Sequence, residues 1–425
     1  MKRSIPVLAL LVLAMIEAVA TGRPIFYNLA SSLLAIVVLA YLWAWYNVCW
    51  IALERHTISE RTQVGKAAEE RFVVRNVGPF GKQWLEVLDH SELPGHHASM
   101  VVNSLPAGRD RGWSVRTICQ QRGRFRLGPL TVASGDPFGL FTHRRQVPLT
   151  GSILVYPLAV DLPHFGSESG QVTGGGRLYR RTHYVTSNVA SVRDYYPGDT
   201  FNRIHWPSTA RTGRLVVKEF ELDPMAEVWL FADMEAAVQA VLPPGLSPAA
   251  AYGDLPILPA HPLASLHPST EEYVVAVAAS LARYYLGRNR AVGLLMQGRE
   301  RELVLPDRGE RQMVKLYESL AVVRAQGQVN MAQLLAAEAS SFGRNSVVVV
   351  ITPSTDDPWV RVLRDLGQRG VHGIAVVIDP QGFGSSREAG GIMQALAESG
   401  IPGYRVRQGD SLVAALAGPL PAPGS

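Results

Sequence analysis

The sequence has little of what marks a small secreted scaffold or a cysteine-ligated metal protein. Its 425 residues include only two cysteines, Cys49 and Cys119. Two cysteines are too few for a disulfide framework or a Cys-ligated zinc site. Charged residues make up 18% of the chain and hydrophobic residues 47%. This composition is too apolar for a disordered protein and too polar for a multi-span transporter, and the length indicates two or three domains.

The familiar catalytic motifs are also missing. The chain has no Gly-x-Ser-x-Gly elbow, zincin motif, Walker loop or Rossmann glycine fingerprint. One weak candidate for a catalytic pair remains, in which His183 or His205 would lie near Cys119. It is weak because the chain has 11 histidines. We therefore predict that the protein is not an enzyme and binds no cofactor. An enzyme with an unrecognised active site is the alternative.

Long apolar runs occur only at the N-terminus. Residues 5–20 are almost wholly apolar, and a second apolar stretch follows from 25 to about 51. A span needs about 20 apolar residues, so the second stretch is long enough and the first is marginal. Basic residues flank the outer ends of the pair, and only Arg23 lies between them, which makes both ends cytoplasmic by the positive-inside rule. The sequence predicts a two-pass hairpin over 1–53; cleavage of the first stretch as a signal peptide would leave the same orientation.

Residues 54–160 have the pattern of an antiparallel β-sandwich. Short segments rich in Val, Ile, Leu and aromatic residues are separated by Gly, Pro, Asn or Asp, and no helical period of useful length occurs. The expected strands cover 71–78, 83–90, 98–105, 112–120, 125–134 and 151–157. His96, His97 and His143 lack metal-ligand spacing with a third candidate, so we assign them to loops.

Three arginines of this domain recur at a spacing of two. Arg122, Arg124 and Arg126 would share one face of a strand. They form either a basic stripe for anionic lipid or an acidic partner, or the ordinary solvated face of an antiparallel sheet.

Residues 161–225 comprise a linker and the most informative segment of the chain. The linker is glycine-rich at 166–176 but lacks the features of a phosphate loop. The segment 191–221 reads SVRDYYPGDTFNRIHWPSTARTGRLVVKEFE and interleaves both signs of charge. Asp199 can cap a short helix over 201–204. Such a segment either locks against a domain through paired charges or presents a polar recognition surface.

This segment resembles the signature of the domain-of-unknown-function family 58 (DUF58). The resemblance rests on R-D-Y-Y-P-G-D, R-I-H-W and A-R-T-G-R-L-V-V-K-E-F-E in that order. Upstream, Gly123-Arg124-Phe125, Leu127-Gly128-Pro129-Leu130 and Asp136-Pro137-Phe138-Gly139-Leu140-Phe141 also fit. Pro207 stands where relatives commonly have a basic residue, so no role is carried over to that position. The signature positions that we take as a candidate interface are Arg193, Tyr195, Pro197, Gly198, Asp199, Arg203, His205, Trp206, Ala210, Arg211, Gly213, Lys218 and Glu219.

The resemblance implies an architecture and partners but no established reaction. Members look like membrane-anchored proteins with a β-rich region followed by a von Willebrand factor A-like domain. They are commonly encoded beside MoxR-type AAA ATPases and transglutaminase-like membrane proteins. The implied function is a non-catalytic adaptor that works with a MoxR-type ATPase in assembly or maturation of protein complexes at the cytoplasmic membrane face.

Residues 226–425 have the alternation of a doubly wound α/β domain. Strands are expected at 227–233, 291–297, 301–306, 346–352 and 373–379, with helices at 271–287, 311–325, 331–343, 359–370 and 391–400. The short connection between the second and third strands indicates an antiparallel edge. A proline-rich insertion at 243–268 is either a lid or partner-docking loop, or a disordered insertion.

A von Willebrand A-type domain would hold a divalent cation at the carboxyl ends of these strands through oxygen ligands. Here the first loop reads Asp233-Met234-Glu235-Ala236-Ala237, in which Asp233 is retained and Ala237 offers no oxygen. Val329 stands where a threonine is expected, and Pro353 stands near the position of an aspartate. The sequence therefore predicts a vestigial Asp233 and no tight metal site.

The net charge of +5 is unevenly distributed. Residues 1–53 carry +2, residues 54–160 carry +5, residues 161–225 carry +1 and residues 226–425 carry −3. The basic excess lies nearest the membrane segments and comes with no nucleic-acid-binding motif. It favours the anionic lipids of the cytoplasmic leaflet as a partner, with nucleic-acid binding as a weaker alternative.

Overall fold

The structure is a computed structural model that describes residues 5–165, 189–195, 204–220, 227–242 and 266–418. The chain divides into two compact units, which are described separately. The first unit comprises Met1–Ala159, Pro244–Ala279 and Tyr317–Val323, and the second comprises Val160–Pro243, Ser280–Leu316 and Arg324–Ser425. Residues 166–176 of the predicted linker and most of the 243–268 insertion lie outside the described residues.

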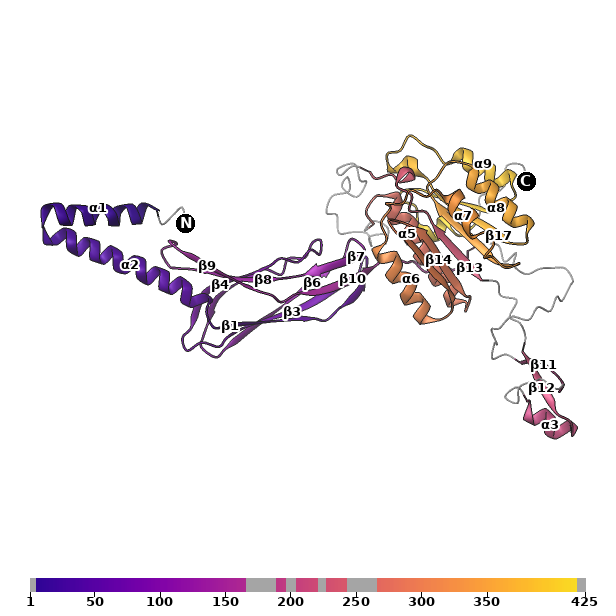
Figure 1. The fold of residues 1–425 in the computed structure, drawn as a ribbon, viewed down its shortest axis with the longest axis horizontal. Coiled ribbons are helices and arrows are strands. Elements are labelled where there is room, and N and C mark those ends of the chain that lie inside the picture. Colours follow the sequence, from indigo (N-terminus) through magenta and orange to yellow (C-terminus); the bar gives the residue numbers. More distant parts are fainter. Residues whose placement is uncertain (1–4, 166–188, 196–203, 221–226, 243–265, 419–425) are drawn as a thin grey trace. The chain divides into compact units, whose positions relative to one another are not determined.

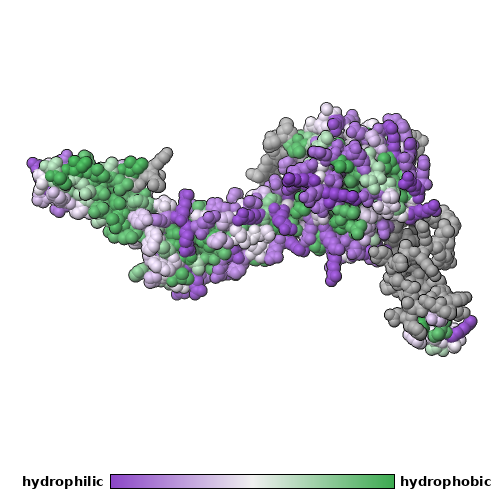
Figure 2. Space-filling view, in the orientation of Figure 1, coloured by the Kyte–Doolittle hydropathy of each residue, from purple (hydrophilic) through white to green (hydrophobic). Residues whose placement is uncertain are grey.

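The first unit begins with two apolar helices, α1 (Ile5–Thr21) and α2 (Pro24–Val48), which form a hairpin (Figure 1). Pro24 lies at the first turn of α2, where its missing N–H leaves no hydrogen bond unmade. The helices meet through Leu11, Ala14 and Ala30, while most of their other apolar side chains are exposed (Figure 2). Among the described helices, α2 is the one long and apolar enough to cross a membrane; α1 is shorter, at 17 residues.

Ten strands follow in three sheets. They are β1 (Ile51–Thr57), β2 (Arg61–Gln63), β3 (Ala67–Asn76), β4 (Lys82–Asp89), β5 (Met100–Leu105), β6 (Asp110–Ile118), β7 (Gly123–Leu127), β8 (Leu130–Gly135), β9 (Thr142–Val147) and β10 (Gly151–Tyr156). The sheet orders are β1-β3-β6, β5-β4-β8-β9 and β2-β10-β7. Apolar residues of the first two sheets, such as Phe72 and Leu85, share one core. All described pairings here are antiparallel except β2 with β10.

Three details of this region differ from the expectation, the first being that β1, β2 and β9 were not among the expected strands. The sheet begins at Ile51, inside the predicted hairpin segment 1–53, because α2 already ends at Val48. The single strand expected over 125–134 is two strands, β7 and β8, separated by a cis Gly128-Pro129 bond. Gly128 has a φ of 74°, and a Cβ there would lie 2.1 Å from the Leu149 carbonyl oxygen, so the turn requires glycine.

The second unit contains a six-stranded sheet of order β15-β14-β13-β16-β17-β18. The strands are β13 (Val228–Ala232), β14 (Val292–Gln297), β15 (Arg301–Asp307), β16 (Val347–Thr352), β17 (His372–Ile378) and β18 (Gly403–Val406). All neighbours are parallel except the edge strand β15, which confirms the predicted antiparallel edge. The order reverses at β13, as in doubly wound folds. The fully buried pattern of β13 is typical of a parallel sheet covered by helices.

All but the last of the remaining helices are close to the predicted ranges. They are α5 (Thr270–Gly287), α6 (Glu310–Val322), α7 (Met331–Glu338), α8 (Pro358–Gln368), α9 (Gly390–Glu398) and α10 (Leu412–Ala415). Trp229 and Phe231 of β13 share a core with Leu335 of α7 and Trp359 of α8. This packing fixes the strand ends at which the candidate metal residues lie. The sequence did not predict β18 and α10.

The signature segment forms a small element of its own. Strand β11 (Val189–Asp194) pairs with β12 (Val216–Phe220). The short helix α3 (Trp206–Thr212) comes between them in the sequence and lies at one end of the strand pair (Figure 1). Ile204 makes an isolated bridge to Val217, so the helix expected over 201–204 does not include it. The other expected positions of that helix, and Asp199, lie outside the described residues.

Candidate functional site

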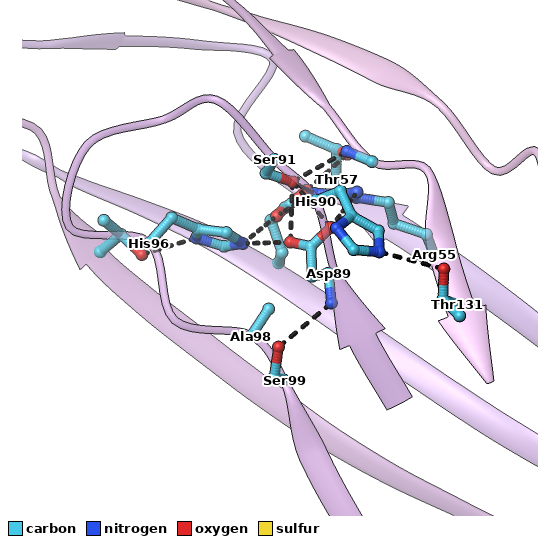
Figure 3. Close-up of polar contacts among 12 residues, drawn as sticks. Arg55, Thr57, Asp89, His90, Ser91, His96, Ala98, Ser99 and Thr131 are labelled. Atoms are coloured by element: carbon cyan, nitrogen blue, oxygen red, sulfur yellow. Dashed lines mark hydrogen bonds and ion pairs between the residues drawn. The ribbon is translucent and has the colours of Figure 1, made fainter. Parts of the chain in front are cut away.

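A buried ion cluster joins the β1-β3-β6 sheet to the β5-β4-β8-β9 sheet in the first unit (Figure 3). Arg55 comes from β1, Glu70 from β3, Asp89 from β4 and His96 from the loop that follows β4. Each of these side chains is at most 4% exposed. Antiparallel pairing places Thr57 opposite Glu70, which brings the β1 and β3 members onto neighbouring strands.

Every carboxylate in the cluster has two cationic neighbours. Arg55 binds Glu70 through Nε and Nη2, at 3.0 and 2.7 Å, and reaches Asp89 Oδ1 with Nη1 at 3.3 Å. His96 Nε2 lies 3.1 Å from Glu70 Oε2 and 3.1 Å from Asp89 Oδ2. Ser91 donates to Asp89 at 2.7 Å, and its oxygen accepts the Gly128 N–H at 2.8 Å. The cluster therefore also fixes the turn at Gly128.

The electrostatics of the cluster favour the charged forms of Glu70, Asp89 and His96. Burial alone would raise the pKa of Glu70, but hydrogen bonds from His96 and Arg55 outweigh it and lower the pKa to about 2. Burial would lower the pKa of His96, but Asp89 and Glu70 outweigh it and raise the pKa to about 9. Burial would likewise raise the pKa of Asp89, but hydrogen bonds from His96 and Ser91 and the charge of Arg55 outweigh it and lower the pKa. At neutral pH two cations balance two anions.

Glu70, Asp89 and His96 have the spacing of a metal-binding triad, yet their chemistry favours a structural clamp. A metal needs the neutral imidazole, whereas Asp89 and Glu70 raise the pKa of His96 to about 9 and so favour its protonated form. The Arg55 guanidinium already binds both oxygens of Glu70 and Oδ1 of Asp89.

His96 and His97 lie in a loop as expected, whereas the assignment of His143 to a loop is wrong because it lies in β9. The sequence did not predict that the His96 ring is buried against Glu70 and Asp89. Spacing along the chain could not show this.

The second site lies at the carboxyl ends of the parallel strands. Parallel pairing of β13 with β16 brings Asp233 beside Thr352. Thr352 Oγ1 donates to Asp233 Oδ2 at 2.5 Å, and Glu235 N donates to Asp233 Oδ1 at 3.0 Å. Burial raises the pKa of Asp233 to about 6 against the Thr352 hydrogen bond, which lowers it. The sequence missed Thr352, although a polar residue ending a Val-rich strand was the available signal.

The donors at this edge do not fit the divalent-cation site considered from the sequence. Both Asp233 oxygens already accept hydrogen bonds, and Asp379, at the end of β17, is bonded to Arg405 at 2.6 Å. Gly327, in the middle loop, exchanges backbone hydrogen bonds with the Asp233 loop, at Met234 and Ala236. A Cβ at Gly327 would lie 2.0 Å from the Gln297 carbonyl oxygen. The loops close on one another and leave Asp233 turned inward.

We therefore expect that titration of the purified protein with Mg²⁺ or Mn²⁺ reveals no single-equivalent site of micromolar affinity at Asp233. The reason is that Asp233 would have to break two hydrogen bonds, and Ala237 supplies no oxygen to replace them. Isothermal titration calorimetry of the wild type and of Asp233→Ala is the measurement. One equivalent of micromolar binding that disappears in Asp233→Ala would contradict the expectation.

The three arginines of the predicted stripe do not share one surface. Arg124 and Arg126 of β7 are exposed, but Arg122 precedes the strand and its side chain is fully buried. Arg122 donates to the Leu320 and Val323 carbonyl oxygens at 3.0 and 2.8 Å and pairs with Glu271 at 2.6 Å. All of these residues belong to the first unit. Arg122 therefore anchors the N-terminal turn of α5 and the last turn of α6, which corrects its assignment to the stripe.

The signature element has an apolar base and an exposed tip. Ile204, Val216 and Val217 are buried, whereas Trp206 at the start of α3 is 62% exposed. Gly213 ends α3 in the left-handed region with φ 69°, and His205 Nδ1 lies 2.7 Å from Ser208 Oγ. Ala210 and Arg211 are exposed on the same helix. The signature residues that lie on or beside β11 and β12 are Arg193, Tyr195, Lys218 and Glu219. The signature residues that lie outside the described residues are Pro197, Gly198, Asp199 and Arg203.

The thiol considered as a nucleophile is poorly suited to that role. Cys119 is fully buried, and burial raises the pKa of its thiol. A reactive cysteine needs partial exposure and a lowered pKa. His183 lies outside the described residues, and His205 is bonded to Ser208.

Comparison with known proteins finds a family model and a relative that match part of the chain. The model of DUF58, described as a protein of unknown function, matches residues 191–240 and 259–382. The uncharacterized protein YeaD of Bacillus subtilis (strain 168) is 24% identical over 201 residues. These matches support the DUF58 family. The YeaD match covers 47% of this chain and 43% of YeaD, so the chain matches less than half the length of that relative.

Among solved structures, two likenesses are weak. The conserved hypothetical protein BatB from Bacteroides thetaiotaomicron is 15% identical, with a TM-score of 0.32, over 45% of this chain and 95% of that chain. The CARDB domain of PF1109 from Pyrococcus furiosus, solved with di-metal ions, is 19% identical, with a TM-score of 0.19, over 25% and 91%. Both are too distant to assign a fold or a site.

Proposed function

We propose that this protein is a non-catalytic, membrane-anchored adaptor that presents the signature element to a protein partner. The observation that carries the proposal is the exposed Trp206, held on α3 by a small buried base. A rigid exposed tryptophan is the residue type most often found at the energetic centre of protein interfaces. The exposed Arg211 on α3 adds a side chain that such interfaces also favour.

The anchor in this proposal is the helical hairpin. Helix α2 is long enough to span a bilayer, and α1 crosses with it as a tilted second span, with both ends on the cytoplasmic side. The basic excess of residues 1–160 supports this orientation, because it would face the anionic leaflet. The α/β sheet of the second unit is the von Willebrand factor A-like domain of the proposal, with its metal position closed by Thr352.

The partner class follows from the family neighbourhood implied by the signature. It is a MoxR-type AAA ATPase, with a transglutaminase-like membrane protein as a further component, in assembly or maturation of complexes at the membrane. We divide the chain accordingly into the hairpin (1–53), the sandwich (54–160), the linker and signature (161–225) and the A-like domain (226–425).

The test is binding of the detergent-solubilised full chain to the MoxR-type ATPase of the same source organism, in the ATP-bound and the ADP-bound state. Trp206→Ala is expected to weaken binding about 30-fold, since a central tryptophan contributes about 2 kcal/mol or more. Leu305→Ala is the matched control, because Leu305 is an equally exposed apolar residue of the same unit on the edge strand β15. Absence of binding in both nucleotide states, or equal losses in the two variants, would contradict the proposal.

A further inference from the structure

The upstream motif at 136–141 has no role in the adaptor proposal, yet it forms a tightly built loop between β8 and β9. Asp136 is buried, and its oxygens accept the backbone N–H groups of Phe138 at 2.8 Å and Phe141 at 2.6 Å. Gly139 turns the chain with φ 69°. The result is a loop with Leu140 buried and Phe138 held outward, 66% exposed, at the tip. The Asp136 carboxylate therefore holds the loop in a conformation that exposes the apolar Phe138 side chain.

This loop lies along the apolar helix α2. The Phe141 ring packs edge-on against the Tyr41 ring with centroids 5.6 Å apart, and the His143 ring lies 4.9 Å from the same tyrosine. Tyr41 precedes the last helical residue, Val48, by seven positions, which is about 10 Å at 1.5 Å per residue. The loop therefore extends back along α2, past the point where the helix joins the sheets.

The end of α2 is fixed to the sandwich by specific hydrogen bonds. The buried Lys82 donates to the Tyr46 carbonyl oxygen at 2.7 Å, and its Nζ lies 3.3 Å from the Tyr46 ring centroid. Asn47 Oδ1 accepts the Gln83 N–H at 3.3 Å. These contacts belong to one compact unit. The direction of α2 in the bilayer therefore determines the depth of the 136–141 loop in the bilayer.

The length of α2 sets that depth. Twenty residues from Pro24 to Trp43 span about 30 Å, the thickness of the hydrocarbon core. Tyr41, Trp43 and Trp45 then lie at the boundary between lipid and water, where aromatic belts occur. The loop that touches Tyr41 lies at the same level.

Two further exposed aromatic residues lie at this end of the sandwich. Trp84 is 64% exposed, and its carbonyl oxygen accepts a hydrogen bond from Ser134 Oγ of β8 at 2.9 Å, two residues before the motif. Phe80 is 69% exposed, and its N–H donates to Tyr46 Oη at 3.0 Å. Just behind the loop, Arg144 of β9 is exposed and can meet lipid phosphate.

We infer that Phe138, Trp84 and Phe80 insert into the interfacial layer of the bilayer that α2 spans, so that this end of the sandwich is a lipid-embedded surface. The inference rests on the proposed membrane anchoring. Three exposed aromatic residues, two from loops and one from β4, lie at the depth of an interfacial belt and match the preference of aromatic side chains for that layer. The bilayer is favoured over a protein partner because the surface is continuous with the apolar helix.

The experiment places a fluorescent NBD label at single cysteines in the full chain, reconstituted in nanodiscs of phosphatidylcholine and phosphatidylglycerol. Cys49→Ser and Cys119→Ala remove the native thiols. Phe138→Cys reports on the loop, and Leu39→Cys, an exposed position of α2, reports on the anchor. Ile118→Cys is the matched control, since Ile118 is equally exposed and pairs with Ala67 at the far end of β3, about 30 Å from the Asn76 end.

The expected result is blue-shifted emission and quenching by doxyl-labelled lipid at 138 and at 39, with quenching by aqueous iodide only at 118. If the label at 138 behaves as the one at 118 while the label at 39 lies in lipid, the inference is wrong and the anchor stands. If the label at 39 is also in water, the anchor and the inference both fail. Because the nanodisc contains no other protein, a surface reserved for a protein partner would give the aqueous result at 138.

Discussion

Glu70→Gln is expected to lower the free energy of unfolding of the sandwich by about 3–5 kcal/mol, because breaking a buried ion pair leaves its partners uncompensated. Glu70 is bonded by both Arg55 and His96 inside a core, and its side chain is 2% exposed. The amide that replaces it cannot balance either cation. Arg55 and the protonated His96 would then share only Asp89.

Hydrogen–deuterium exchange of the detergent-solubilised full chain is the suitable measurement, because it reads the opening of β3 and β4 separately from that of the second unit. The expected loss corresponds to exchange in those strands faster by about two to four orders of magnitude, at 1.36 kcal/mol per factor of ten.

The adjacent glutamate provides the control. Glu69 lies on the opposite face of β3, where it pairs with Arg116 at 3.5 Å, and the two side chains are 50% and 75% exposed. An exposed pair of this kind contributes at most about 1 kcal/mol, so Glu69→Gln should leave exchange nearly unchanged. Equal acceleration by the two substitutions would show that the cluster does not stabilise the sandwich.

The second large effect is on the pH dependence of the stability of the sandwich, which is expected to be constant over a range of pH and to fall at both lower and higher pH. The pKa of Glu70 falls from the usual 4.5 to about 2, so its contribution is complete above 4.5 and is lost as the pH falls toward 2. The pKa of His96 rises from the usual 6.5 to about 9, so its contribution is complete below 6.5 and is lost as the pH rises toward 9. The lowered pKa of Asp89 adds to the acidic decline. Protection of β3 and β4 should therefore be greatest between about pH 4.5 and 6.5, with a loss of a few kcal/mol on each side.

The loss of stability at alkaline pH is due to His96 and can be tested separately from the loss at acidic pH. His96→Gln should abolish the dependence between pH 6.5 and 9 and lower the plateau, because the amide cannot carry the proton that Glu70 and Asp89 stabilise. His97→Gln, at the exposed neighbouring position, should leave the whole profile intact. The measurement is the exchange rate of β3 and β4 as a function of pH, corrected for the intrinsic effect of pH on exchange. If His96→Gln still loses stability between pH 6.5 and 9, the assignment of this loss to His96 is wrong.

Several features were determined by the sequence alone because they depend on short-range pattern. The apolar run of α2, the alternation of strands and helices after residue 226 and the antiparallel edge at β15 follow from hydrophobic period and loop length. The signature at 191–221 also supported the DUF58 family before any fold was known. The strand over 125–134 was misread because a glycine–proline turn was hidden within an apolar run.

The sites were decided by tertiary structure, because the groups that meet are distant in the chain. Arg55, Glu70, Asp89 and His96 lie on three strands and a loop, and only sheet pairing and loop closure turn four ordinary surface-type residues into one buried cluster. Arg122 carried the same spacing signal as Arg124 and Arg126, yet its burial depends on helix ends some 150 to 200 positions later in the chain. Asp233 finds Thr352 through strand register alone. Charge and spacing identify which residues can ionise, but burial and pairing decide their pKa values, and both are set by contacts that no local pattern encodes.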